Sequence, residues 1–222
     1  MSFHRGPKII TDGLVLALDA ANPKSYSGTG TVWNDLSGNS NNGTLINGPT
    51  FDSGDNGSIV FDGVNDYVAT TIPTSSAFSF CMFVNKNTAP IVNECFISTL
   101  GNNNRFQFNR SSSSFSWRYR VFDGSYSNFT SASNYINLNT WYHITVTYNE
   151  STVNFYKNSI FTDTFTSVSL YGGFGSTVWV GGNLVNNVYF NGTIANTQIY
   201  NRALSAQEVL QNYNATKSRY GL

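Results

Sequence analysis

Carboxylate side chains are the first candidates for chemistry, and glutamate is scarce in this chain. Retaining hydrolysis of a glycosidic bond uses two carboxyl groups roughly 5 Å apart, one as nucleophile and one as acid and base. The three glutamates, Glu94, Glu150 and Glu208, are far apart in the sequence, and no expected strand carries two alternating carboxylates. Glu150 falls in an expected turn, and Glu208 stands three residues after Ser205, where the two complete a helix capping box. This pattern argues against a glycosidase.

The histidines and cysteines form no catalytic or zinc-binding pattern either. A catalytic triad needs a supported histidine, but His4 is close to the N-terminus and His143 alternates with apolar neighbours in an expected strand. No His-x-x-x-His or Cys-x-x-Cys spacing of a zinc site is present. Cys81 lies in the apolar run FSFCMFV, so we expect Cys81 and Cys95 to be reduced core residues, although the sequence does not settle whether they pair. The sequence predicts that the protein is not an enzyme and has no catalytic residues.

Calcium is the one cofactor that the sequence leaves open. The ion takes about six to eight oxygen ligands, mostly carboxylates and carbonyls from loops. Asp62 and Asp66 flank an expected turn, and Asp19, Asn22 and Asp35 lie in the loop-rich first quarter of the chain. Asp and Asn are also the ordinary turn-forming residues. We favour the turn interpretation and predict no cofactor and no metal-binding residue.

Aromatic and arginine side chains near the middle of the chain are of the types that contact sugars, and the glycan role itself is implied by the family resemblance given below. In residues 115–122, FSWRYRVF, the strand alternation places Trp117 on one face and Arg118 and Arg120 on the other. Sugars stack their C–H faces on aromatic rings and form hydrogen bonds with polar side chains. Trp117 is expected to pack in the core with its apolar neighbours. The predicted carbohydrate contacts are therefore Arg118, Arg120 and Tyr126.

Composition excludes several classes of partner. Twelve basic and twelve acidic residues balance, and charged residues are only 11% of the 222. Zero net charge argues against binding of nucleic acid through phosphates and against a basic membrane-surface protein. No apolar run is long enough to span a bilayer. The N-terminal residues MSFHRGPKII do not resemble a signal peptide, so we expect synthesis and folding in the cytoplasm.

Hydrophobic patterning predicts many short strands and one helix in a single domain. We expect hairpins over 58–70, 105–122 and 141–159, strands over 13–20, 77–84 and 176–182, and loop over 33–49. The helix should start at Ser205, with Leu204 and Val209 as a hydrophobic staple and with Val209, Leu210 and Tyr213 as its apolar face. About a dozen strands with turns between them are typical of an antiparallel sandwich or barrel.

Four segments, in this order, resemble a known family. They are WNDLSGNSNNGTLINGPTF, IVFDGVNDYV, WYHITVTYNESTVNFYKN and GTIANTQIYNRALSAQEVLQNYNAT. Together they look like a laminin-G-like domain of the concanavalin A-like lectin/glucanase superfamily. The resemblance implies an all-β fold, an antiparallel two-sheet jelly-roll sandwich with one short C-terminal helix. It implies a domain over 13–222, closed by a helix over about 205–214 and preceded by an N-terminal arm over 1–12. The Glu-x-Asp-x-x-Glu pattern of the superfamily's glucanases is absent.

The opening residues, GPKIITDGLVLALDAANPKSYSGTGTVWNDLSGN, resemble laminin-G-like domains in tailed-phage virion proteins. That resemblance implies a non-enzymatic virion surface protein, present in many copies or as a homo-oligomer. We expect a tail-fibre or tail-tip adhesin that binds the host envelope polysaccharide. The alternative is a structural capsid-decoration or tail protein, which would use the lectin-like fold to assemble with other virion proteins and would bind no sugar.

Overall fold

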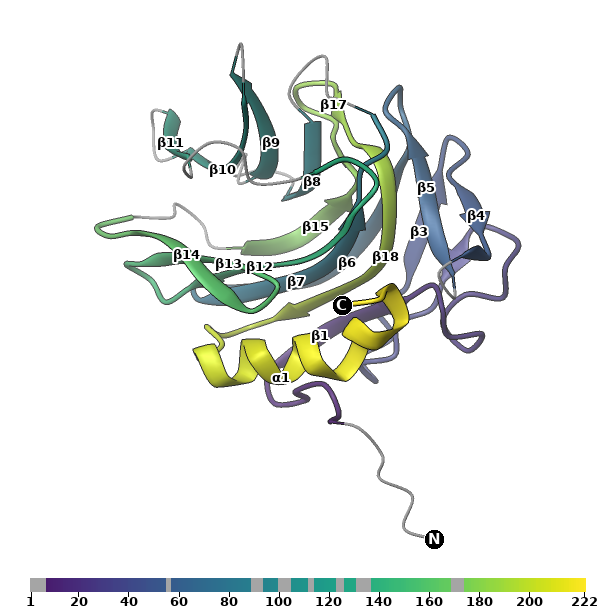
Figure 1. Cartoon of the computed structure of the whole chain (residues 1–222), viewed down its shortest axis with the longest axis horizontal. Helices are drawn as coiled ribbons and strands as arrows, with labels where there is room; N and C mark the ends of the chain where they lie inside the picture. The colour runs from purple at the N-terminus through teal and green to yellow at the C-terminus, as the bar shows by residue number, and fades with distance from the viewer. Residues whose placement is uncertain are drawn as a thin grey trace, which may run out of the picture.

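The computed structural model describes residues 7–54, 57–88, 94–99, 105–111, 114–122, 126–130, 137–168 and 174–222, and for the strands within 105–130 it describes the backbone. Two eight-stranded antiparallel sheets pack face to face, and a two-stranded hairpin and one helix lie outside them (Figure 1). The predicted all-β sandwich with a C-terminal helix is therefore confirmed. No helix in the described part of the chain is long and apolar enough to cross a membrane.

The first sheet, here sheet A, contains the strands against which the helix packs. Its strands follow the order β14-β13-β12-β7-β18-β5-β4, and β1 pairs with β18 outside that path. Their bounds are β1 Leu14–Asp19, β4 Thr50–Asp52, β5 Ser58–Asp62, β7 Phe78–Asn85, β12 Trp141–Tyr148, β13 Val153–Lys157, β14 Ile160–Phe165 and β18 Asn191–Tyr200.

The second sheet, here sheet B, runs in the order β11-β10-β9-β8-β15-β6-β3-β2. Its strands are β2 Val32–Trp33, β3 Gly43–Ile46, β6 Tyr67–Ser75, β8 Glu94–Thr99, β9 Arg105–Ser111, β10 Ser114–Phe122, β11 Tyr126–Thr130 and β15 Phe174–Val180. The small hairpin joins β16 (Gly182–Asn183) to β17 (Val188–Tyr189). It packs against β8, where Ser98 Oγ donates to the Gly182 carbonyl (2.7 Å).

Aromatic side chains fill the space between the two sheets. Phe78 of β7 stacks on Phe174 of β15 with ring centroids 4.5 Å apart, and Phe96 of β8 contacts Phe190 at 4.7 Å. Burying a Phe side chain contributes about 1.5–3 kcal/mol. β7 is apolar on both faces because sheet B covers its inner face and the helix covers part of its outer face. The cysteines are free and buried, as expected, with Cys81 in sheet A and Cys95 in sheet B.

Two of the three expected hairpins are confirmed, and one is wrong. β9 pairs with β10 and β12 pairs with β13, each antiparallel. The hairpin expected over 58–70 does not form, because β5 pairs in sheet A with β4 and β18, whereas β6 pairs in sheet B with β3 and β15. Gly63, which directly follows β5, has a positive φ of 78°. The turn between these strands therefore carries the chain from one sheet to the other.

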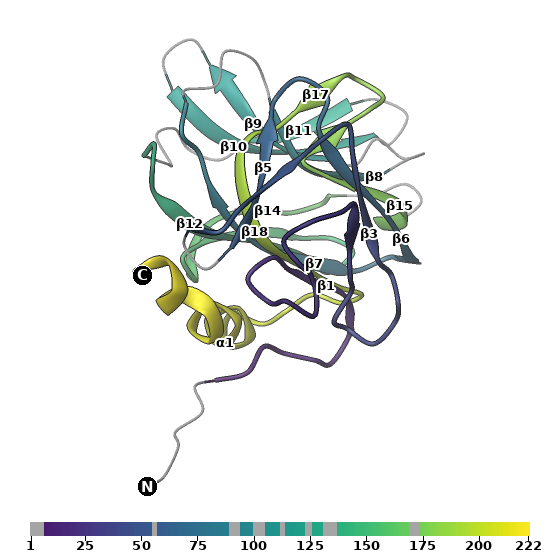
Figure 2. The ribbon, with the colours of Figure 1, turned by 90° about the vertical axis from the view of Figure 1, so that its right-hand side faces the viewer.

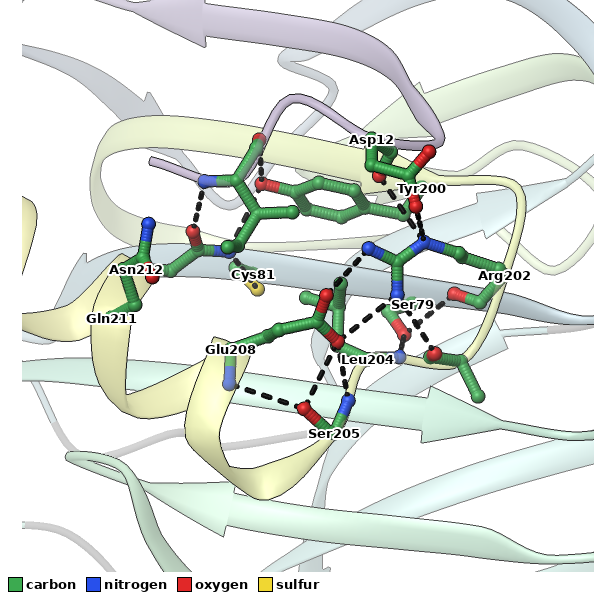
Figure 3. A network of polar contacts seen from close by, with 12 residues as sticks. Asp12, Ser79, Cys81, Tyr200, Arg202, Leu204, Ser205, Glu208, Gln211 and Asn212 are labelled. Atoms are coloured by element: carbon green, nitrogen blue, oxygen red, sulfur yellow. Dashed lines mark hydrogen bonds and ion pairs between the residues drawn. The ribbon is translucent and has the colours of Figure 1, made fainter. Parts of the chain in front are cut away.

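The helix α1 (Ala206–Thr216) starts as the sequence predicts. Ser205 is its N-cap and its hydroxyl accepts from the Glu208 N–H, while the Ser205 N–H donates to Glu208 Oε2 (2.8 Å; Figure 3). Arg202 adds two hydrogen bonds to the same carboxylate, at 3.0 and 2.6 Å. Chiefly because of this guanidinium, the pKa of Glu208 falls to about 2. A 3₁₀ helix, η2 (Lys217–Tyr220), follows.

The face that α1 buries differs in part from the predicted one. Val209 is buried with Leu204, as the staple predicts, but Leu210 is 46% exposed. Asn212 and Thr216 are buried in its place, since they share the face of Val209 at helical spacing. A buried asparagine requires hydrogen-bond partners. The apolar pattern of the helix therefore did not indicate that a polar side chain, Asn212, is buried against the sandwich.

Asn212 ties three distant segments together. Its Nδ2 donates to Tyr200 Oη (2.9 Å) and contacts the Cys81 sulfur (3.7 Å), and its Oδ1 accepts from the Ile10 N–H (2.8 Å; Figure 3). Tyr200 Oη in turn donates to the Ile10 carbonyl (3.0 Å). Gln211 Nε2 donates a hydrogen bond to the Lys8 carbonyl (2.8 Å). The described part of the N-terminal arm is therefore bound to the helix and to β18, on one side of the sandwich (Figure 2).

Replacing Asn212 should destabilise the contacts between the N-terminal arm, α1 and β18. In Asn212→Ala the part-buried Ile10 N–H loses its partner and the Tyr200 hydroxyl loses one of its two, so the free energy of unfolding should fall by about 1–3 kcal/mol. Denaturant unfolding measures this change. The neighbouring Gln211→Ala, which removes an exposed hydrogen bond, should cost less than about 0.5 kcal/mol. Equal losses in the two variants would show that Asn212 is no anchor.

His143, expected to be structural, is buried beneath the C-terminal helices. Its ring lies 4.7 Å from Phe83 and 5.7 Å from Tyr213, and its Nδ1 has no hydrogen-bond partner. Burial lowers the pKa of His143 from 6.5 to about 3. Between these two values the unfolded chain binds a proton that the folded protein does not, so stability falls as the pH falls.

We expect His143→Leu to flatten the pH dependence of stability. Between pH 6.5 and 5 the native protein should lose up to about 1.4 kcal/mol per pH unit through this one group, and the variant should not. Urea unfolding across this range measures the difference in slope. Identical slopes would mean that His143 is protonated in the folded protein.

Candidate functional site

The outer face of sheet B carries a continuous row of residues across seven strands. Val68 of β6 is buried in the core, so its neighbour Ala69 lies on the opposite, outward face. The strand register then connects this position to its partners in the other strands. The row is Thr44, Ala69, Trp179, Ser98, Arg105, Arg120 and Asn128.

An open depression of about 470 Å³ lies at the β3–β6–β15 part of this face. We call it the polar depression. Its lining side chains are all uncharged, and all but one carry a hydroxyl or an amide. They are Ser40, Asn41, Asn42, Thr44, Ala69, Thr70, Thr71 and Thr177.

Asp35 organises the loop that forms one wall of the polar depression. Its Oδ1 accepts from the Ala17 and Ser37 N–H groups (2.8 and 2.9 Å), and its Oδ2 accepts from the Ser37 hydroxyl and the Asn41 N–H (2.7 and 3.0 Å). The Asp35 N–H donates to Asn42 Oδ1 (2.9 Å). A segment that the sequence predicts as loop is therefore held in one conformation by a single carboxylate.

Asn41, one of the two asparagines of the wall, is joined to the sheets on either side. Asn41 Nδ2 donates to the Val15 carbonyl of β1 (2.8 Å), and the Asn41 carbonyl accepts from Thr70 Oγ1 of β6 (2.7 Å). Gly43 follows directly, where a Cβ atom would lie 2.7 Å from a Val68 methyl group. This close approach requires glycine and brings the loop against β6.

The chemistry of the polar depression suits a neutral, hydroxyl-bearing ligand. Hydroxyls donate one hydrogen bond and accept two, and amides present both donors and acceptors. An ionic ligand would find no opposite charge among the lining residues. The size falls within the roughly 300–1,000 Å³ of small-molecule sites. The depression is therefore fitted to sugar hydroxyls more than to phosphates or charged peptides.

The three predicted carbohydrate contacts stay a prediction, because the structure describes only their backbone. Arg118 and Arg120 are in β10 and Tyr126 begins β11, where it pairs with Phe122. Their register places all three on one face of sheet B, and it is the face that carries the polar depression. The expected core packing of Trp117 stays a prediction too, because its side chain lies outside what the structure describes.

The aspartates considered for calcium form turns and hydrogen bonds. Asp62 Oδ1 accepts from the Val64 N–H (2.7 Å), and Asp66 Oδ2 accepts from the Asp62 N–H (3.1 Å). Asp19 forms an ion pair with Arg219 (2.7 Å), and Asn22 Oδ1 accepts from the Lys24 N–H (3.0 Å). Among the described residues, no three His, Cys, Asp or Glu side chains gather as metal ligands would.

Sequence reasoning missed the partner of Glu94. Lys86 Nζ lies 2.8 Å from Glu94 Oε2, and the two side chains are 2% and 5% exposed. Lys86 also donates to the Asn191 carbonyl (2.7 Å), and the Asn191 N–H donates to Glu94 (3.1 Å). Burial raises the pKa of Glu94 and lowers that of Lys86. The pair provides hydrogen-bond partners for the N–H and carbonyl groups of Asn191, at the start of β18. The only indication of this pair in the sequence is a lysine and a glutamate at the ends of neighbouring apolar runs.

Comparison with known proteins identifies the family. Residues 61–210, more than half of the chain, match the Concanavalin A-like lectin/glucanases superfamily. The chain therefore belongs to this superfamily. A comparison with curated protein sequences found no match.

Solved structures show the same fold at low sequence identity. The binding domain of Paraclostridial Mosquitocidal Protein 1 is 21% identical with a TM-score of 0.68, over 92% of this chain and 52% of that one. The receptor binding domain of botulinum neurotoxin C/D mosaic serotype is 14% identical with a TM-score of 0.70, over 92% and 51%. Domain 4 of AbnA, an extracellular arabinanase from Geobacillus stearothermophilus, solved with arabinotriose, is 15% identical with a TM-score of 0.69, over 90% and 98%. The chain thus spans about half of the two toxin chains and nearly all of the arabinanase domain.

Removing the Asp35 carboxylate should release the wall of the polar depression. Asp35→Ala removes the acceptor of four hydrogen bonds, so we expect a loss of about 1–3 kcal/mol in unfolding free energy. Amide hydrogen exchange should accelerate in residues 37–42. Asp52→Ala is the control, because Asp52 accepts from the Gly54 N–H at the exposed surface. Unchanged exchange in 37–42 would contradict the organising role of Asp35.

Proposed function

We propose that the protein is a non-enzymatic carbohydrate-binding module that recognises neutral glycans on the outer face of sheet B. The observation that carries this proposal is the polar depression, whose lining is rich in hydroxyls and amides and carries no charge. Membership of a lectin-like superfamily supports it. Domain 4 of the arabinanase AbnA, which has the same fold, was solved with arabinotriose.

The location of the predicted arginines and tyrosine is consistent with a longer binding surface. Arg118, Arg120 and Tyr126 occupy the same face of the same sheet as the polar depression. Between them and the depression lies the β16–β17 hairpin, which packs against β8. A glycan chain of several units would contact the depression first and these positions second.

The absence of enzymatic activity is part of the proposal. Each of the three glutamates already has a structural role. Glu94 pairs with buried Lys86, Glu208 completes the capping box, and Glu150 lies in a turn with a φ of 76°. This arrangement supports binding without hydrolysis. Incubation with a bound oligosaccharide should therefore leave it uncleaved.

The biological setting we propose is the surface of a tailed-phage virion. There the module would act as a tail-fibre or tail-tip adhesin for the host envelope polysaccharide, in many copies or as a homo-oligomer, after folding in the host cytoplasm. The support is the sequence resemblance described above and the balanced charge, which disfavours nucleic acid as a partner. The second candidate is a capsid-decoration or tail protein that assembles with virion proteins and binds no sugar. Exposed apolar residues on β14, Ile160 at 70% and Phe161 at 53%, favour such protein contacts.

Glycan binding is tested with a variant that fills the polar depression. Purified protein is applied to an array of bacterial envelope glycans and arabino-oligosaccharides, and the dissociation constant of the best neutral ligand is then measured by calorimetry. Thr71→Arg places a long, charged side chain in the depression, and we expect at least a ten-fold loss of affinity. A charge without a partner among neutral groups also disfavours the desolvation that binding requires.

Two further variants test which residues of sheet B contact the glycan. Thr74→Arg is the matched control, because Thr74 is exposed on the same strand and does not line the depression. It should bind as the native protein does. Joint replacement of Arg118, Arg120 and Tyr126 by Ala should weaken binding of long oligosaccharides more than short ones. Failure of the correctly folded protein to bind any glycan would refute the carbohydrate proposal and leave the assembly candidate.

A further inference from the structure

We propose a second ligand site, separate from the polar depression, in a cavity of about 430 Å³ between the N-terminal arm, β1 and the C-terminal helices. We call it the arm cavity, and its ligand is a neutral sugar or sugar-like polyol. This proposal does not depend on binding at the polar depression. The lining residues that carry the argument are Ile9, Leu14, Asp19, Leu36, Gln198 and Arg219.

The walls of the arm cavity come from segments far apart in the sequence that the fold holds in place. The arm is fixed by the bonds of Asn212 to Ile10 and of Gln211 to the Lys8 carbonyl. Arg202 Nε forms an ion pair with Asp12 Oδ2 (2.8 Å), at the C-terminal end of the arm. The described part of the arm therefore forms one wall of the cavity.

Gln198 of β18 supplies the polar group that lacks a partner. Its side chain lines the cavity and is only 5% exposed, and its Oε1 accepts no hydrogen bond within the protein. A buried, unsatisfied acceptor costs about 1–3 kcal/mol. The fold retains it at the edge of a cavity, where a hydroxyl or amide donor of a bound molecule would satisfy it.

The charged groups of the arm cavity largely compensate one another. Arg219 Nη1 donates to both oxygens of Asp19, at 3.0 and 2.7 Å. Side chains of this pair are 34% and 17% exposed, so a ligand hydroxyl can reach either member. Lys8 also lines the cavity but is exposed to solvent. Because Asp19 and Arg219 neutralise each other, the site favours a neutral ligand over an anion or a cation.

Aliphatic side chains form much of the remaining surface. Ile9, Leu14 and Leu36 line the cavity, and Leu36 is 39% exposed despite its apolar side chain. A mostly apolar cavity with a few polar groups is the usual construction of a small-molecule site. A sugar ring fits this combination, because its C–H faces can lie on aliphatic groups while its hydroxyls contact the amide and the ion pair.

Replacing Gln198 distinguishes a ligand-binding group from a structural one. Gln198→Leu removes the unsatisfied acceptor and keeps a similar volume, so the ligand-free variant should be at least as stable as the native protein. If the amide instead holds a water that braces the fold, the variant should be less stable. Gln198→Glu, which keeps the shape and adds a charge, is the second variant should the first fail to fold.

The experiment is a titration followed by backbone amide NMR, with glucose, galactose, mannose and arabinose as neutral probes and inorganic phosphate as the anionic probe. We expect saturable shifts in residues 8–19, 198 and 215–219 with at least one neutral probe and none with phosphate. The dissociation constant should rise at least ten-fold in Gln198→Leu and stay unchanged in the control Gln207→Leu, because Gln207 is exposed on α1 and does not line the cavity. It should also stay unchanged in Thr71→Arg, which separates this site from the polar depression.

Three results would overturn the proposal. One is the absence of saturable shifts at these residues with every neutral probe. Another is tighter binding of phosphate than of any sugar, which would contradict the neutral class. The last is equal sugar affinity in the native protein and in both Gln198 variants.

Discussion

The burial of aromatic rings between the two sheets is the interaction on which the rest of the structure depends. Phe78 and Phe80 of β7 stack on Phe174 of β15, with centroids 4.5 and 6.2 Å apart. Each such pair contributes about 0.5–1.5 kcal/mol beyond the area it buries. Because these rings must point inward, the neighbouring residue of each strand must point outward. The core therefore decides which side chains are available for binding.

The two outer faces created in this way differ in what covers them. The outer face of sheet A is partly covered by α1, η2 and the arm, which are anchored by Asn212 and by the rings of Phe83 and Tyr220 at 4.4 Å. The outer face of sheet B has the β16–β17 hairpin against β8 and keeps an uncharged depression beside it. Hydroxyl and amide side chains replace charges there, in line with a chain in which charged residues are only 11%. A face covered by anchored elements and an open, neutral face are consistent with the proposed binding of glycans on sheet B.

The elements whose signals are local were predictable, and those that depend on distant partners were not. Ser205 and Glu208 identify the helix start because the capping box lies within four residues. The 58–70 segment looked like a hairpin because its pattern does not reveal that each strand pairs elsewhere. Asn212 was missed as a buried residue because its partners lie in the arm and in β18. The polar depression combines residues 40–44, 69–71 and 177, and only the sheet pairing brings them together.

The most direct test of the account is a map of backbone amide shifts as the tightest-binding neutral oligosaccharide is added to the native protein. The account predicts saturable shifts concentrated in residues 40–44, 69–71 and 177, around the polar depression. Shifts that saturate elsewhere on the surface, with these residues unchanged, would contradict the central claim that the open face of sheet B is the principal glycan-binding surface.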